Sequence, residues 1–188
     1  MKNNRKYICS AGKQCKVLNT SISKREITFY PVVFNDLDSW GRMYSPTSFN
    51  RTIKNNNFTF PHLVEHMSNE VVGKTIRMEP DDIGLLTVVK VSNTTKGDDL
   101  LTLYNDGIYK YHSFAGYIIQ SEWRQSEGKD IEYVTELALD ETTTTLFPAN
   151  RNAALVSLNG SLLSGINHKH PNEEEVKELI DFINNFKI

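Results

Sequence analysis

The apolar run GLLTVVKV at residues 84–91 predicts a buried strand more clearly than any other segment of the 188-residue sequence. Leucine, valine and threonine fill most of it, and such side chains pack well on the pleated surface of a sheet. The turn-forming residues PDD at 80–82 precede it, and the alternating run VVGKTIRM at 71–78 predicts another strand before that turn. The centre of the chain is therefore expected to be a β-sheet.

Further strands are expected on both sides of this centre, in segments rich in β-branched and aromatic residues. These segments are 27–34, 58–66, 112–123 and 133–147. Apolar residues recur at helical spacing in 48–54 and 100–108. The pattern predicts the α+β class, a mostly antiparallel β-domain with two or three helices.

The chain divides into three regions: a basic, aperiodic N-terminal arm at 1–24, a folded domain at 25–160, and a linker with a C-terminal helix at 161–188. In the last region Asn172 can cap a helix and Glu175 completes the capping-box spacing. One apolar stripe follows, made of Val176, Leu179, Ile180, Ile183 and Phe186. Such a stripe suits a helix that covers the core, a dimer contact or a docking element for another protein.

Composition excludes several classes of protein. The 21 lysines and arginines nearly balance the 23 aspartates and glutamates, so no overall charge favours a nucleic-acid or membrane partner. Cys9 and Cys15 are too few for a disulfide framework and poorly spaced for a metal site, so we expect free thiols in a reducing cytosol. No apolar run is as long as a signal peptide or a membrane span, and the protein is expected to act where it is made.

The string HLVEH at 62–66 has the H-x-x-E-H order of the inverted zinc peptidases. In that reaction His62 and His66 would bind zinc and Glu65 would be catalytic, but a helix must bring residues four apart onto one face. Pro61 and the extended residues before it favour a strand instead, in which His62 and His66 would lie roughly 13 Å apart. We therefore expect His62 to be a structural core residue, and a zinc peptidase is the least favoured reading.

A serine nucleophile needs a positioned base, and the base needs an acceptor that orients it. Spacing along the chain cannot identify such a set of residues. Ser113 is flanked by the large residues Tyr111 and Phe114 and by the small residues Ala115 and Gly116. The small pair would allow the backbone of a substrate to approach closely.

A family resemblance adds to this pattern. Its blocks, in order, are NDLDSWGRMYSPTSFNRTI (35–53), FPHLVEHMSNEVVGK (60–74), MEPDDIGLL (78–86), YHSFAGY (111–117) and LDETTTTLFPANRNAAL (139–155). With these blocks, residues 26–158 resemble the prohead protease family of tailed phages, distant relatives of the herpesvirus assemblin. The resemblance implies an assemblin-like fold, a barrel-like and mostly antiparallel β-domain with flanking helices.

The same resemblance implies that Ser113 is the nucleophile and His66 the catalytic base. The third position falls on Glu141, and a carboxylate suits it because it would accept from the imidazole and stabilise the cation formed during proton transfer. Glu136 and Asp140 are rivals for this role. Strand alternation puts Asp140 and Glu141 on opposite faces, so only one of these two neighbours can point at His66.

The resemblance also implies an oxyanion hole made of backbone N–H groups near Asn150 and Arg151. The sequence departs from the family in two places. Ala115 occupies the family's usual glycine position and Gly116 follows it, and four threonines at 142–145 replace an apolar run. These threonines keep β propensity but make the strand more polar.

The function implied by the resemblance is a serine endopeptidase that processes scaffold protein, capsid protein or both inside the immature phage prohead, in the host cytoplasm. It allows self-cleavage and a homodimer, and it implies no cofactor, no membrane and no specific nucleic acid. The alternative is a catalytically degenerate assembly or scaffold factor of the same fold, suggested by the threonine run and the altered block after Ser113.

Overall fold

The computed structural model describes residues 25–158 except 56, 58 and 127, together with 7–8, 14–15 and 161–162. The expected C-terminal helix and most of the N-terminal arm lie outside the described residues. Within the described part, neither helix is long and apolar enough to cross a membrane.

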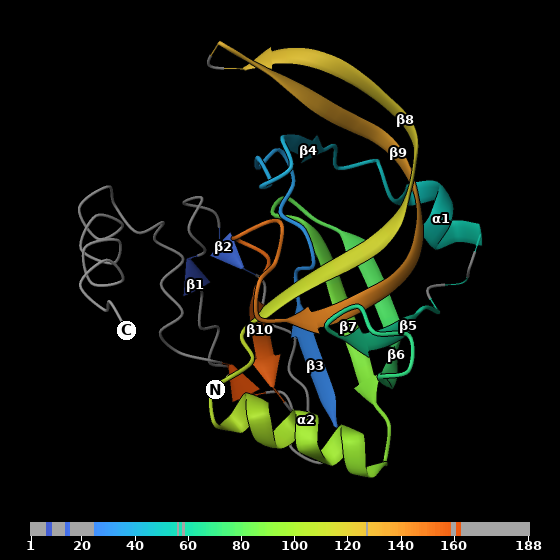
Figure 1. Ribbon diagram of the computed structural model, residues 1–188, viewed down its shortest axis with the longest axis vertical. Coiled ribbons are helices and arrows are strands. Elements are labelled where there is room, and N and C mark those ends of the chain that lie inside the picture. The colour runs from blue at the N-terminus through green and yellow to red at the C-terminus, as the bar shows by residue number, and fades with distance from the viewer. Residues whose placement is uncertain are drawn as a thin grey trace, which may run out of the picture.

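The fold is organised around one nine-stranded sheet (Figure 1). Its order is β11 (Ser161–Leu162), β10 (Leu155–Leu158), β3 (Glu26–Phe29), β7 (Leu85–Val91), β6 (Val71–Pro80), β5 (Pro61–Val64), β9 (Lys129–Thr145) and β4 (Arg42–Tyr44), with β8 (Tyr111–Ser126) paired to β9. Two further strands, β1 (Tyr7–Ile8) and β2 (Gln14–Cys15), pair with each other. The mostly antiparallel α+β class is confirmed, although β5 and β4 run parallel to β9 and the described pairings do not close the sheet into a barrel.

The apolar run at 84–91 forms β7, which lies between β3 and β6 and is buried along nearly its whole length. Helix α2 (Thr95–Asn105) lies across one end of the sheet and packs Leu100, Leu101 and Tyr104 into a core cluster with β3 and β7 (Figure 1). The helix begins earlier than the apolar spacing predicted. Thr94 supplies the N-cap, because its hydroxyl accepts from the backbone N–H of Gly97 at 3.1 Å.

The second core cluster supports strand β8, whose Phe114 and Ile118 pack against it. Helix α1 (Asn50–Asn55) lies beside β9, and the cluster contains Phe49 and Ile53. The Phe49 ring meets the edge of Phe114, the residue after Ser113, with 5.2 Å between ring centroids. The expected strand at 27–34 is shorter than predicted: β3 ends at Phe29, since the N–H of Tyr30 donates to Ala154 and Pro31 has no N–H to donate.

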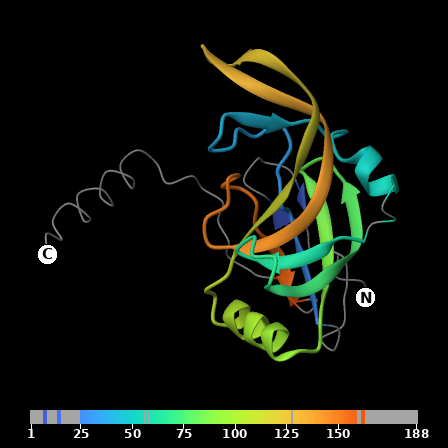
Figure 2. The same ribbon diagram turned by 45° about the vertical axis from the view of Figure 1, so that its right-hand side comes forward.

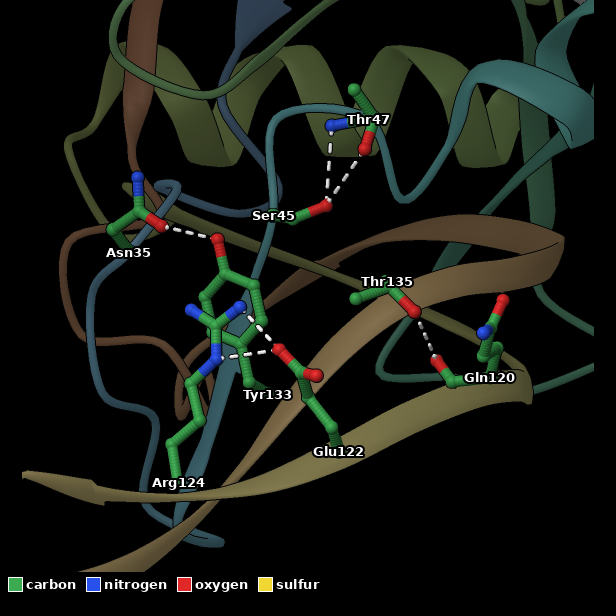
Figure 3. A network of polar contacts seen from close by, with 8 residues as sticks. All are labelled: Asn35, Ser45, Thr47, Gln120, Glu122, Arg124, Tyr133 and Thr135. Carbon is green, nitrogen blue, oxygen red and sulfur yellow. Dashed lines mark hydrogen bonds and ion pairs between the residues drawn. The ribbon is translucent and has the colours of Figure 1, made fainter.

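Strands β8 and β9 continue past the rest of the sheet as a hairpin arm that projects from the body (Figures 1 and 2). Tyr133 joins the arm to the body, because its hydroxyl donates to the side chain of Asn35 at 2.8 Å. The guanidinium of Arg124 lies 3.4 Å from the centre of the Tyr133 ring and also donates to Glu122 (Figure 3). One end of each long strand is therefore in the body, and the other is exposed.

Two histidines, His62 and His112, are fully buried in the core. Both ring nitrogens of His62 are 2.9 Å from threonine hydroxyls, those of Thr142 and Thr144, and His112 stacks on Phe29 with a centroid separation of 3.7 Å. Burial lowers the pKa of His62 to about 3 and the pKa of His112 well below its ordinary value. His62 is therefore a neutral core residue, as the strand prediction expected.

These buried histidines make the stability of the protein depend on pH. Below about pH 6.5 a histidine in the unfolded chain binds a proton, whereas the same histidine in the folded chain stays neutral. The free energy of unfolding therefore decreases as the pH falls toward the folded-state pKa. We expect His62→Gln to remove the part of this decrease in the free energy of unfolding that His62 causes. Between pH 7.5 and 5.5, the wild type should lose about 1.4 kcal/mol more than the variant.

Urea unfolding of both proteins at the two pH values measures this difference, because the contributions of all carboxylates cancel between them. An equal loss of stability in the two proteins would show that His62 titrates normally in the folded state.

Candidate active site

The turn after β5 presents His66 to solvent. Glu65 and His66 both have left-handed backbone angles, with φ of 52° and 58°, which cost roughly 1–2 kcal/mol each for residues other than glycine. The turn is held against β9: the N–H of Glu65 donates to the carbonyl of Thr144 at 2.9 Å, and the N–H of His66 donates to the hydroxyl of Thr143 at 3.0 Å. The neighbouring strand thus fixes a backbone conformation that these residues rarely adopt alone.

Glu141 contacts the His66 ring from β9. Its Oε1 lies 2.7 Å from Nδ1 of His66; the Glu141 side chain is 9% exposed and that of His66 41%. A proton on Nδ1 would be donated to this carboxylate, leaving Nε2 as the free acceptor on the ring. The second oxygen of Glu141, Oε2, is buried without a hydrogen-bond partner in the described part of the chain.

The two rival carboxylates lie elsewhere. Asp140 is exposed, whereas its neighbour Glu141 is buried, as expected from strand alternation. Glu136 forms an ion pair with Arg51, with 2.7 Å between the charged atoms. Of the three candidates, Glu141 is therefore the one in contact with His66.

The register of β8 against β9 brings Ser113 to the same face. Ser113 lies opposite Thr143, and Ala115 lies opposite Glu141. Residues directly opposite each other on neighbouring strands point to the same side of the sheet. Ser113 therefore shares a face with Glu141 and with the threonine that holds the backbone of His66.

Ser113 and His66 line one cavity of about 870 Å³. Ser113 is 8% exposed, and Trp40 and Phe147 are largely exposed along the lining. This volume lies in the upper part of the usual range for ligand sites, roughly 300–1,000 Å³. The cavity can therefore accept several side chains of a bound peptide.

The four threonines at 142–145, which sequence analysis treated as a departure from the family, all have partners. Thr142 and Thr144 point to His62, on the core side of β9. Thr143 points to the other side and accepts from His66, and Thr145 donates to the carboxylate of Glu65 at 2.7 Å. An apolar run could not hold either histidine in this way, and this explains the polar strand.

The loop that follows β9 contributes Asn150 and Arg151, the expected oxyanion residues, to the lining of the cavity. The residue that holds this loop, Asp36, was not predicted from the sequence. Oδ2 of Asp36 accepts from the side-chain amides of Asn150 at 3.1 Å and Asn152 at 2.9 Å. No local pattern in the sequence links these positions, which are more than 100 residues apart.

Two readings of the sequence have different outcomes in the structure. Gly116 lines the cavity, and it has a further role in the sheet: a Cβ there would lie 2.1 Å from the carbonyl oxygen of Ala138, so the glycine permits close approach of β9. The H-x-x-E-H string does not form the helix of a zinc peptidase. Its first residues belong to β5, and no group of three or more potential ligands that could hold a metal occurs among the described residues.

The solved structures with a similar fold include three viral proteases. The capsid assembly protease gp21 of bacteriophage T4 superposes with a TM-score of 0.53 at 10% identity, over 71% of this chain and 92% of that chain. The KSHV protease bound to a hexapeptide phosphonate inhibitor and the varicella-zoster virus protease both give TM-scores of 0.48, at 10% and 11% identity. Each of these two likenesses covers 86% of this chain and 77% of the other.

No curated protein matches the sequence. A family model does match, over residues 14–162, and its description is caudovirus prohead serine protease. This range includes the β5 turn, both long strands of the cavity and the loop held by Asp36. The fold is similar to that of the T4 capsid assembly protease, and the chain belongs to the prohead serine proteases of tailed phages.

Proposed function

We propose that this protein is the serine endopeptidase that processes scaffold protein, capsid protein or both inside the immature prohead. The contact that carries the proposal is the 2.7 Å pair between His66 and Glu141, at the cavity that Ser113 also lines. Membership of the prohead serine protease family supports this class of reaction. The likeness to a capsid assembly protease agrees with it at the level of the fold.

In the proposed reaction, Oγ of Ser113 attacks the carbonyl carbon of the scissile peptide bond while Nε2 of His66 takes the hydroxyl proton. Glu141 holds the ring by Nδ1 and stabilises the imidazolium that forms. His66 then gives the proton to the leaving amine, and water resolves the acyl-enzyme by the same steps in reverse. Backbone N–H groups near Asn150 and Arg151 would stabilise the negative charge on the carbonyl oxygen.

The buried position of Glu141 favours this role over a purely structural one. A carboxylate with one oxygen on the imidazole and the other without a partner is poorly solvated, and a positive charge on His66 would improve its environment. The degenerate assembly factor has less support now, because each threonine that suggested it has a partner in the site or the core.

The nucleophile is tested by Ser113→Ala, with Ser121→Ala on the exposed part of the same strand as the matched control. Loss of the hydroxyl should lower turnover by about 10⁶-fold, because the base then has no proton to accept. The fold should be kept, since only one oxygen is removed. Co-expression with the phage's own scaffold and capsid precursors, followed by mass spectrometry, measures the processing.

A fluorophosphonate probe provides a second measurement on the purified protein. It should label the wild type and Ser121→Ala but not Ser113→Ala. Trimming of the precursors by Ser113→Ala would show that another residue is the nucleophile, and a wild type that is never labelled would favour the degenerate factor.

The third residue is tested by comparing Glu141→Gln with Glu136→Gln. The amide at position 141 cannot balance the charge of the imidazolium, so kcat should decrease by about 10⁴-fold. Glu136→Gln removes only a partly exposed ion pair with Arg51 and should change kcat less than about threefold. Steady-state kinetics on a capsid-precursor peptide distinguishes them, and a larger loss for Glu136→Gln would reassign the role.

A further inference from the structure

Glu65, the glutamate of the H-x-x-E-H string, has no part in the proposed reaction, yet its carboxylate is well bonded. One oxygen accepts from the hydroxyl of Thr145 at 2.7 Å, and the other accepts from the backbone N–H of Leu146 at 2.9 Å. Burial, followed by the negative charge of Glu65, raises the pKa of the Tyr109 phenol. Glu65 is thus joined to the C-terminal end of β9.

These bonds lie beside an unusual backbone conformation in the turn that carries His66. Glu65 and His66 are consecutive left-handed residues, and neither is a glycine. The backbone bonds of the turn go to Thr143 and Thr144, while the carboxylate of Glu65 extends the attachment to Thr145 and Leu146. An unusual backbone conformation of this kind persists when its surroundings hold it at several points.

Glu65 also connects two parts of the site. Glu65 directly precedes His66 in the chain. Leu146, to which it is bonded, is the first residue of the segment that lines the cavity through Phe147 to Asn150. A single carboxylate therefore contacts both the turn that carries the proposed base and the beginning of the proposed oxyanion loop. A shift of the turn would change the geometry between His66 and Ser113, and a shift of the loop would move the proposed oxyanion N–H groups.

We propose that Glu65 is a positioning residue, whose carboxylate holds the turn of His66 against the end of β9 and so keeps the imidazole aligned with Glu141 and Ser113. The inference rests on the proposed function. Glu65 touches neither the substrate nor the reacting atoms, and its effect passes through His66.

Three variants separate the carboxylate from the backbone conformation. Glu65→Ala removes the carboxylate, and Glu65→Gly removes it while favouring the left-handed angle. Glu65→Gln keeps both bonds, because its amide oxygen can accept from Leu146 and its NH₂ can donate to the hydroxyl of Thr145. Glu70→Ala is the matched control, since Glu70 lies in the same connection but pairs with Lys96.

The measurement is the rate of fluorophosphonate labelling of Ser113 in the full-length protein, resolved into a maximal rate and a half-saturating probe concentration. Glu65→Ala and Glu65→Gly should lower the maximal rate by roughly 10- to 100-fold, because a small misplacement of the base is enough. The half-saturating concentration should stay within about twofold. Glu65→Gln should remain within about threefold of the wild type, and Glu70→Ala should not differ from it.

Two outcomes would overturn the inference. One is a maximal rate for Glu65→Ala and Glu65→Gly within about twofold of the wild type. The other is a loss of maximal rate in Glu65→Gln equal to that in Glu65→Ala. Glutamine keeps both hydrogen bonds and lacks only the negative charge, which positioning does not need.

An NMR measurement keeps this test separate from the proposed function. We expect the proton between Nδ1 of His66 and Glu141 to give a low-field signal that does not depend on turnover. This signal should broaden or disappear in Glu65→Ala and return in Glu65→Gln. A wild type that shows the signal but is never labelled would contradict the proposed peptidase, and the response of the signal to the variants would still decide the role of Glu65.

Discussion

The alternation of side chains along residues 141–145 of β9 is the constraint on which both the core and the site depend. Thr142 and Thr144 face inward and bind the two ring nitrogens of His62. The other three residues face outward and hold the turn of His66. Glu141 contacts the ring of His66, Thr143 accepts from the backbone N–H of His66, and Thr145 donates to Glu65. A shift of register by one residue would exchange the two sets and break every one of these bonds.

This arrangement places two chemically identical rings in opposite environments. His62 lies among hydroxyls and apolar side chains in the core, where only the neutral form is stable. His66, four residues later, is partly exposed and has a carboxylate at one nitrogen and a cavity beside it. The single strand β9 thus separates a structural histidine from the one proposed for catalysis, and the separation depends on which face of the strand each contacts.

Apolar periodicity was enough to predict most of the strands, because the apolar side chains of a strand such as β7 are buried. It failed where the deciding contact is local and polar, as at the N-cap Thr94, or where a proline ends a ladder, as at Pro31. The pairing of His66 with Glu141 joins positions 75 residues apart, so only family resemblance suggested it. The partners of the threonines and of Asp36 could not be predicted, since they depend on which turn lies over which face.

The parallel pairing of β5 with β9 joins segments that are made at different times during synthesis. His66 leaves the ribosome 75 residues before Glu141, and the contacts of its left-handed turn with β9 can form only after that strand has been made. Contacts between such distant segments form late, because the intervening chain must first be closed into a loop. A nascent chain therefore contains the proposed nucleophile and the proposed base before it can adopt the geometry of the proposed reaction, which requires a complete β9.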